Sequence, residues 1–249
     1  MDNTKFLLAC HRVMDEGRQN SGIGTLGEKT LHAVLKFYFD PDPAHHEQKA
    51  GSFVADIRNG TGFYEIQTRN FYRLRDKLEA FLPEAPVTVI YPVPALKWLI
   101  WLDEDGTATP PRKSPRRGTA ADVLPELYAI KPLLNREGLR FCVMLLELEE
   151  YRLKNGWSED GKRGSTRFER LPISLIDELW LSSPADYLKL VPGTLPETFT
   201  VKEYGKAAKL SPKRASQAVN VLHAVGALRR TGKVGNAYLY SRTEEKDLT

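Results

Sequence analysis

Residues 52–68 read SFVADIRNGTGFYEIQT, and the rest of the chain is interpreted from this stretch. Apolar, β-branched and aromatic residues are frequent in both of its halves, which is typical of strands. Asn59-Gly60 separates the halves, and this dipeptide is a strong signal for a tight hairpin. We therefore predict two antiparallel strands. Each carries one acid among apolar neighbours, Asp56 in the first and Glu65 in the second.

Helical and extended patterns surround this hairpin. Apolar residues at helical spacing over residues 70–82 predict an amphipathic helix, and the nearly all-apolar run at 86–92 predicts a buried strand. Upstream, residues 28–39 have a helical pattern that Pro41 brings to an end. The other predicted elements are helices at 4–16, about 120–131 and about 172–181, and strands at 46–50, 96–103 and 139–148.

The predicted hairpin brings the carboxylates of Asp56 and Glu65 within reach of one metal ion. Carboxylate oxygens are the ligands that Mg²⁺ and Mn²⁺ prefer, usually together with water and substrate phosphate. The sequence therefore predicts a Mg²⁺ or Mn²⁺ site on the hairpin. The alternative is that both acids occupy an ordinary solvated face of the sheet, since side chains alternate between the two faces of a strand.

Residues 25–103 resemble the PD-(D/E)XK nuclease superfamily, the restriction-endonuclease-like fold. The resemblance rests on an acid in the first helix, Glu28, on Asp56 in one strand, and on Glu65-Ile66-Gln67 in the next, in the element order αβββαβ. It implies an α/β domain in which Asp56, Glu65 and Glu28 hold a metal ion. The activity implied is metal-assisted hydrolysis of a phosphodiester. The whole chain is also similar to an uncharacterised bacterial family.

Two positions depart from the superfamily pattern. Gln67 stands where the superfamily usually has lysine, and an amide forms hydrogen bonds but carries no positive charge. Ala55 precedes Asp56, so the usual Pro-Asp dipeptide is absent. The resemblance implies a catalytic set of Glu28, Asp56, Glu65 and Gln67, with Arg69 placed to clamp the phosphate. Two alternatives stay open: a catalytically inactive nuclease fold that binds DNA or regulates, and a capping-box role for Glu28.

Positive charge is concentrated in the last fifth of the chain. Residues 200–249 hold 10 Lys and Arg against 4 Asp and Glu, whereas residues 1–199 hold 26 against 28. This basic segment contains two helical patterns and then two short strands around a glycine-bearing turn, which is typical of a winged helix-turn-helix. A proline- and glycine-containing linker at 192–196 precedes it. We therefore predict a nuclease-like domain, residues 1–191, and a winged-helix domain, residues 192–249.

The predicted partner is DNA, double-stranded or branched. In a winged helix the second helix, here about residues 212–225, enters the major groove, and the wing contacts the phosphates. The alternatives are a winged helix that binds protein and a pure interaction scaffold. The predicted DNA contacts are Lys213, Arg214, Gln217 and Asn220 on that helix, Arg229, Arg230 and Lys233 on the wing, and Arg112, Lys113, Arg116 and Arg117 in a basic loop.

Other classes of protein are excluded by composition. The sequence has no run of about 18 apolar residues, so no membrane partner is expected, and the short apolar run near the N-terminus is too short for a signal peptide. Only 2 cysteines occur, which argues against a disulfide scaffold. We expect a cytoplasmic protein. A homodimer is a further expectation, because many nucleases of this fold act as dimers.

Overall fold

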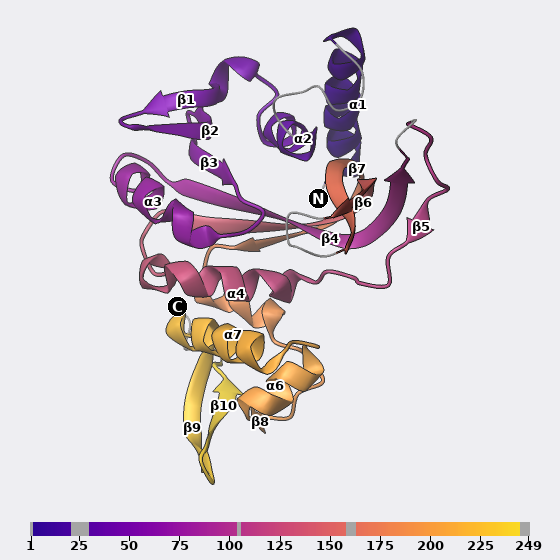
Figure 1. Cartoon of the computed structure of the whole chain (residues 1–249). Coiled ribbons are helices and arrows are strands. Elements are labelled where there is room, and N and C mark those ends of the chain that lie inside the picture. The colour runs from indigo at the N-terminus through magenta and orange to yellow at the C-terminus, as the bar shows by residue number, and fades with distance from the viewer. Residues whose placement is uncertain (1, 21–29, 104–105, 158–162, 245–249) are drawn as a thin grey trace. The chain divides into compact units, whose positions relative to one another are not determined.

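The computed structural model describes residues 2–20, 30–103, 106–157 and 163–244. It is a mixed α/β protein with one large mixed sheet and one three-stranded sheet (Figure 1). The chain packs as two compact units, of which the first comprises residues 1–48, 92–119 and 144–178 and the second residues 49–91, 120–143 and 179–249. The predicted boundary at residue 191 falls within the last segment of the second unit, and this division does not test it.

The predicted hairpin lies in the second unit. Strands β2 (Phe53–Asn59) and β3 (Gly62–Ile66) are antiparallel. β3 then pairs in parallel with β4 (Val87–Leu102). Two parallel neighbours need a crossover connection, and here it consists of the 3₁₀ helix η2 (Phe71–Leu74) and α3 (Arg75–Phe81).

Aromatic packing holds α3 against the hairpin. Phe81 of α3 is fully buried, and its ring stacks on that of Phe63 in β3 with centroids 4.3 Å apart. Leu78, on the same side of the helix, is also buried. Aromatic pairs stabilise a core beyond the area that they bury. The apolar stripe predicted for residues 70–82 therefore faces the sheet, and the residues beside the stripe lie next to β3.

Strand order in the second unit is β2-β3-β4-β6, and β6 spans Leu139–Trp157. Between β4 and β6 the chain forms three short helices in succession, η3 (Ala120–Val123), α4 (Leu124–Leu127) and η4 (Tyr128–Leu133). The short helices α5 (Pro184–Tyr187) and η5 (Leu188–Leu190) follow the last strand of the large sheet.

The C-terminal part of the second unit contains the predicted two helices and two strands. They are α6 (Val201–Ala207), α7 (Pro212–Ala224), β9 (Leu228–Val234) and β10 (Ala237–Arg242), and the short strand β8 (Thr198–Phe199) pairs with β10. Ser211 is the N-cap of α7 and a proline follows it, as predicted. Thr200 and Glu203 form a capping box at α6, in which each side chain satisfies a backbone N–H group.

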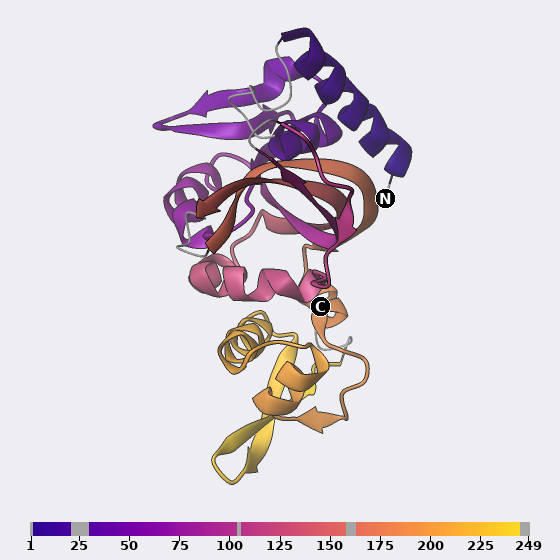
Figure 2. The ribbon, with the colours of Figure 1, turned by 45° about the vertical axis from the view of Figure 1, so that its right-hand side comes forward.

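In the first unit the strand order is β5-β4-β6-β7. The strands curve strongly, as Figure 2 shows. Besides its parts of β4 and β6, this unit contains α1 (Asn3–Asn20), α2 (Thr30–Phe39), η1 (Pro43–His45), most of β1 (His46–Ala50), β5 (Arg112–Lys113) and most of β7 (Arg163–Leu181).

Three predictions about secondary structure were wrong. Residues 172–181 belong to strand β7 and not to a helix. The two strands predicted at 86–92 and 96–103 form one strand, β4 (Val87–Leu102), because the backbone angle that proline imposes is compatible with extended structure. Helix α1 continues to Asn20, past the predicted end at residue 16. In the described part of the chain, no helix combines the length and the apolar character needed to cross a membrane.

Candidate functional site

The two hairpin acids lie side by side in the second unit. Asp56 Oδ2 accepts a hydrogen bond of 2.7 Å from the backbone N–H of Ile66, the residue after Glu65. Asp56 is half-buried, and Glu65 is only 2% exposed. The structure thus brings together the two acids that the sequence singled out, and it buries one of them.

Glu65 is short of hydrogen-bond partners for a buried carboxylate. Its Oε2 accepts from Lys77 Nζ at 2.8 Å, whereas its Oε1 is buried and, among the described residues, has no hydrogen-bond partner. Burial, followed by the negative charge of Asp56, raises the pKa of Glu65 to about 7, and Lys77 acts in the opposite direction. A buried acceptor without a partner is rare in proteins and calls for an explanation.

Lys77 is the functional residue that the sequence analysis missed. It lies on α3 and is followed by the buried Leu78, so it sits at the edge of the apolar stripe. From there its ammonium group supplies the positive charge beside Glu65 that Gln67 cannot supply. The helical period shows that residue 77 flanks the stripe, but only the packing of α3 reveals which strand it reaches.

The other residues predicted for this site do not join the pair. The Gln67 side chain donates to the backbone carbonyl of Arg69, and the Arg69 side chain is exposed. Glu28 falls outside the described residues. Among the residues that the structure describes, no group of three or more His, Cys, Asp or Glu side chains could hold a metal ion. The described part of the site is therefore two carboxylates and one lysine.

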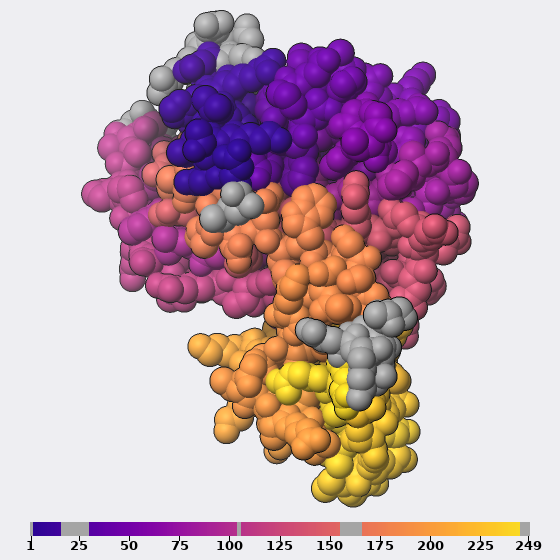
Figure 3. Space-filling view, turned by 180° about the vertical axis from the view of Figure 1, so that it is seen from behind, coloured from indigo at the N-terminus to yellow at the C-terminus, as the bar shows by residue number. Residues whose placement is uncertain are grey.

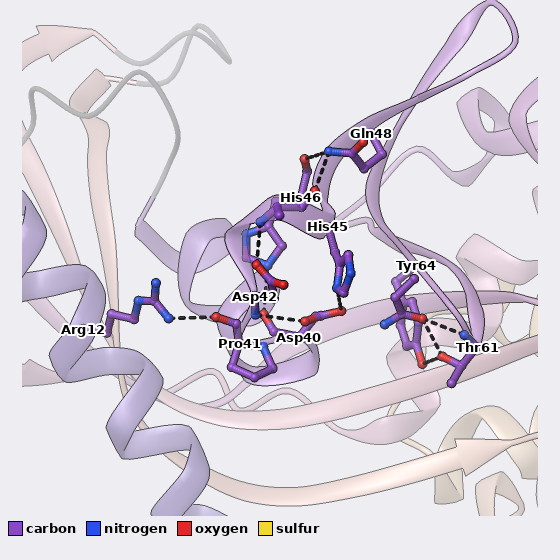
Figure 4. A network of polar contacts seen from close by, with 11 residues as sticks. Arg12, Asp40, Pro41, Asp42, His45, His46, Gln48, Thr61 and Tyr64 are labelled. Atoms are coloured by element: carbon purple, nitrogen blue, oxygen red, sulfur yellow. Dashed lines mark hydrogen bonds and ion pairs between the residues drawn. The ribbon is translucent and has the colours of Figure 1, made fainter.

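A second polar network, in the first unit, surrounds Asp40 (Figure 4). Asp40 Oδ2 lies 2.8 Å from His45 Nδ1, and the backbone carbonyl of Asp40 lies 2.8 Å from His46 Nε2. Arg12 donates to the carbonyl of Pro41 at 2.8 Å. These contacts hold the turn between α2 and β1, so a structural role accounts for them.

Helix α7, predicted to enter a DNA groove, is partly covered within the second unit. Arg214 donates to Asp122 at 2.9 Å, and Asn220 accepts from Lys131 at 2.8 Å. Asp122 belongs to η3 and Lys131 to η4. Helix α4 also lies alongside α7 in Figures 1 and 2. The Arg214 side chain is 34% exposed, and Asn220 is half-buried. Gln217 is also half-buried, whereas Lys213 is exposed.

The predicted wing, β9 and β10, carries an exposed basic and aromatic surface (yellow in Figure 3). The Arg230 guanidinium lies 4.3 Å and the Lys233 ammonium 4.6 Å from the ring centroid of Tyr238. Arg229 is exposed as well, and its Nε donates to Ser241 at 3.2 Å. Within the described part of the chain, none of these three cations forms an ion pair with an acidic side chain, and exposed cations of this kind can contact phosphates.

The basic loop predicted to contact DNA lies in the first unit. Its four basic side chains are all exposed: Arg112, Lys113, Arg116 and Arg117. The two residues of β5 pair with β4, with Lys113 opposite Trp98. The Lys113 ammonium lies 5.6 Å from the centroid of the Trp98 ring.

Comparison with known proteins places these features in a family without an assigned activity. One relative, an uncharacterized protein of Treponema pallidum (strain Nichols), is 30% identical over 149 residues, which are 59% of this chain and 57% of the relative. The aligned part is thus little more than half of that relative. No solved structure matches the chain. The model of a domain of unknown function, DUF8091, matches residues 29–182, and this chain therefore belongs to the DUF8091 family.

Proposed function

We propose that the protein is a metal-dependent nuclease of the PD-(D/E)XK type that acts on DNA. The observation that carries this proposal is the buried Oε1 of Glu65, which has no hydrogen-bond partner among the described residues and lies beside Asp56. Two adjacent carboxylates in a buried place are unfavourable without a cation. Perturbed acids of this kind are concentrated at functional sites.

The donor set fits Mg²⁺ or Mn²⁺. Asp56 and Glu65 present carboxylate oxygens, and hard divalent ions prefer such ligands. Glu28, which follows the glycine-rich stretch, is the third ligand that the superfamily resemblance implies. When bound, the ion neutralises charge on the phosphoryl oxygens and lowers the pKa of coordinated water.

The protein's own groups have separate roles in this proposal. Lys77 favours the ionised form of Glu65, against the effect of burial, and in this proposal its ammonium group also faces the phosphate that is attacked. The backbone N–H of Ile66 holds Asp56 in position. Arg69 is exposed just after β3, and no described contact joins it to Asp56 or Glu65. We propose that its guanidinium group binds the phosphate.

In this proposal the C-terminal module is a winged helix, and its wing supplies most of the affinity for DNA. Arg230 and Lys233 are exposed over an aromatic ring, whereas the Arg214 and Asn220 side chains of α7 are bonded to η3 and η4. Cationic side chains that contact phosphates add to affinity for every DNA sequence. We therefore expect binding with little sequence preference.

The wing and α7 are distinguished by two matched substitutions. Arg230→Ala is expected to weaken binding of a labelled DNA duplex about tenfold, because it removes a phosphate contact. Arg214→Ala removes the same charge from α7, where it already pairs with Asp122, and is expected to change affinity less than about twofold. Fluorescence anisotropy at two salt concentrations measures both. A larger loss for Arg214→Ala than for Arg230→Ala would show that α7 reads DNA after leaving α4.

A specific contact favours a second candidate function, that of a non-catalytic DNA-binding protein with a nuclease fold. Lys77 already lies 2.8 Å from Glu65, so its charge partly neutralises the carboxylate pair in the absence of an ion. In that case Lys77 is a structural substitute for the metal. The two candidates differ in whether divalent ions bind and support cleavage.

Cleavage assays separate the two candidates. Purified protein is incubated with plasmid, single-stranded and branched DNA in the presence of Mg²⁺, Mn²⁺ or EDTA. We expect cleavage of at least one substrate with either ion and none with EDTA. If DNA is bound but no substrate is cut with either ion, the non-catalytic candidate is supported.

A further inference from the structure

A group of cations surrounds one buried carboxylate in the first unit. Glu150, on β6, is fully buried, and it accepts hydrogen bonds from Arg152 on the same strand. Three more cations converge on its Oε2: Arg170 at 3.2 Å, Lys97 at 3.3 Å and Arg167 at 3.7 Å. They come from β4 and β7, the two strands next to β6. We call these five residues the Glu150 cluster.

The Glu150 cluster holds more positive than negative charge. Among the residues that the structure describes, four cations pair with this one carboxylate and outnumber it by three. The neighbouring acids of β6 have other partners, since Glu147 accepts from Trp98 and Glu149 accepts from Tyr151. Both are an odd number of residues from Glu150 and so project from the opposite face of the strand.

Burial is the main cause that lowers the pKa of Lys97 and of Arg170. Glu150 acts to raise both pKa values, and the charges of neighbouring arginines act to lower them. Burial acts to raise the pKa of Glu150, but the hydrogen bond from Arg152 and the charges of Lys97 and Arg170 lower it to about 2. A cleft lined by an excess of one sign of charge attracts ligands of the opposite sign.

Solvent reaches the cationic side chains although it does not reach Glu150. The Arg167 side chain is 43% exposed and that of Arg152 is 32% exposed. Phe168, which lies between Arg167 and Arg170 on β7, is also exposed. On the other side, the backbone N–H of Ser114 donates to the carbonyl of Lys97, which links the basic loop to the same strand.

We propose that the Glu150 cluster is a binding site for the phosphate backbone of a single nucleic-acid strand, in which Glu150 holds Arg152, Arg167, Arg170 and Lys97 in place. The guanidinium group of arginine binds two phosphate oxygens at once through parallel N–H donors. The exposed aromatic ring of Phe168 offers a surface for stacking a base, as in proteins that bind single strands without sequence preference. The inference rests on the proposed function in one respect, namely that nucleic acid is the ligand.

Two matched substitutions test this site. Arg167→Ala removes the most exposed cation of the Glu150 cluster. Lys154→Ala removes one charge from β6 outside the cluster, where Lys154 forms an ion pair with Asp103. Binding of a fluorescent oligo-dT strand is followed by anisotropy at several salt concentrations. We expect Arg167→Ala to weaken binding about tenfold and to lower the salt slope by about 0.7, the value for one lost contact to a single strand. Lys154→Ala is expected to leave both unchanged.

The outcomes separate this site from the nuclease proposal. Equal affinity of Arg167→Ala and wild type, with thermal melts that show both are folded, overturns the phosphate site and leaves the nuclease proposal intact. Equal losses for Arg167→Ala and Lys154→Ala also overturn it, because they indicate a general effect of charge. A wild type that binds no oligo-dT overturns the phosphate site, whereas the nuclease proposal is decided by the cleavage assays on plasmid and branched DNA. If oligonucleotide binding depends on Arg167 but the protein never cleaves DNA, the phosphate site is supported and the nuclease proposal is contradicted.

Discussion

Asp56→Asn and Glu65→Gln are each expected to lower the rate of DNA cleavage by more than about 100-fold. Loss of a group that only supports a metal ligand already costs about 10- to 100-fold in metal affinity or activity, and these two carboxylates are the proposed ligands themselves. Both substitutions keep the shape of the side chain while removing its charge. The rate is measured as the conversion of supercoiled plasmid to nicked and linear forms at saturating Mg²⁺.

Glu84→Gln is the matched control for these variants. Glu84 lies in the same unit, its side chain is 48% exposed, and it pairs with Arg58 at 3.4 Å. The same change of charge there is expected to leave the cleavage rate unchanged, because exposed ion pairs contribute little. Cleavage by Asp56→Asn or Glu65→Gln at the wild-type rate would show that the hairpin acids are not the catalytic centre.

The wild-type protein is expected to lose stability relative to Glu65→Gln as the pH rises from about 5 to 8. The folded state raises the pKa of Glu65 from its ordinary value of 4.5 to about 7. The folded protein therefore holds a proton that the unfolded chain releases, so the stabilisation is complete below pH 4.5 and is lost as the pH rises through 7. The expected loss is about 3 kcal/mol in the free energy of unfolding.

Divalent ions should reverse this loss of stability if Asp56 and Glu65 bind them. At pH 8, Mg²⁺ or Mn²⁺ is expected to raise the melting temperature of the wild type and to leave that of Glu65→Gln unchanged, because ligands stabilise the state that binds them. Urea or thermal unfolding at each pH, with and without the ion, measures both effects. Parallel stability curves for the two proteins from pH 5 to 8 would show that Glu65 has an ordinary pKa.

Glu150 does not interfere with this measurement. Its pKa of about 2 lies below the ordinary value of 4.5, so its contribution to stability is present above pH 4.5 and is lost only as the pH falls toward 2. The two buried glutamates therefore affect stability in separate ranges of pH. A change confined to pH 5–8 is assigned to Glu65.

Local signals in the sequence determined the elements that short-range forces decide. Asn59-Gly60 predicted the hairpin, and Ser211-Pro212 predicted the start of α7, because the backbone preferences of turn and cap residues act within a few residues. The pattern over residues 172–181 fits either a helix or a strand. Pairing with β6, which lies outside that window, decided the strand.

The sequence by itself determined that Asp56 and Glu65 lie on adjacent strands, since a tight turn joins them. Only the tertiary structure decided which cations meet the acids. Lys77 reaches Glu65 across 12 residues, Lys97 reaches Glu150 across 53, and Arg214 reaches Asp122 across 92. These ion pairs depend on how helices and strands pack, and packing is set by long-range burial of apolar side chains, which leaves no periodic trace in the charged residues themselves.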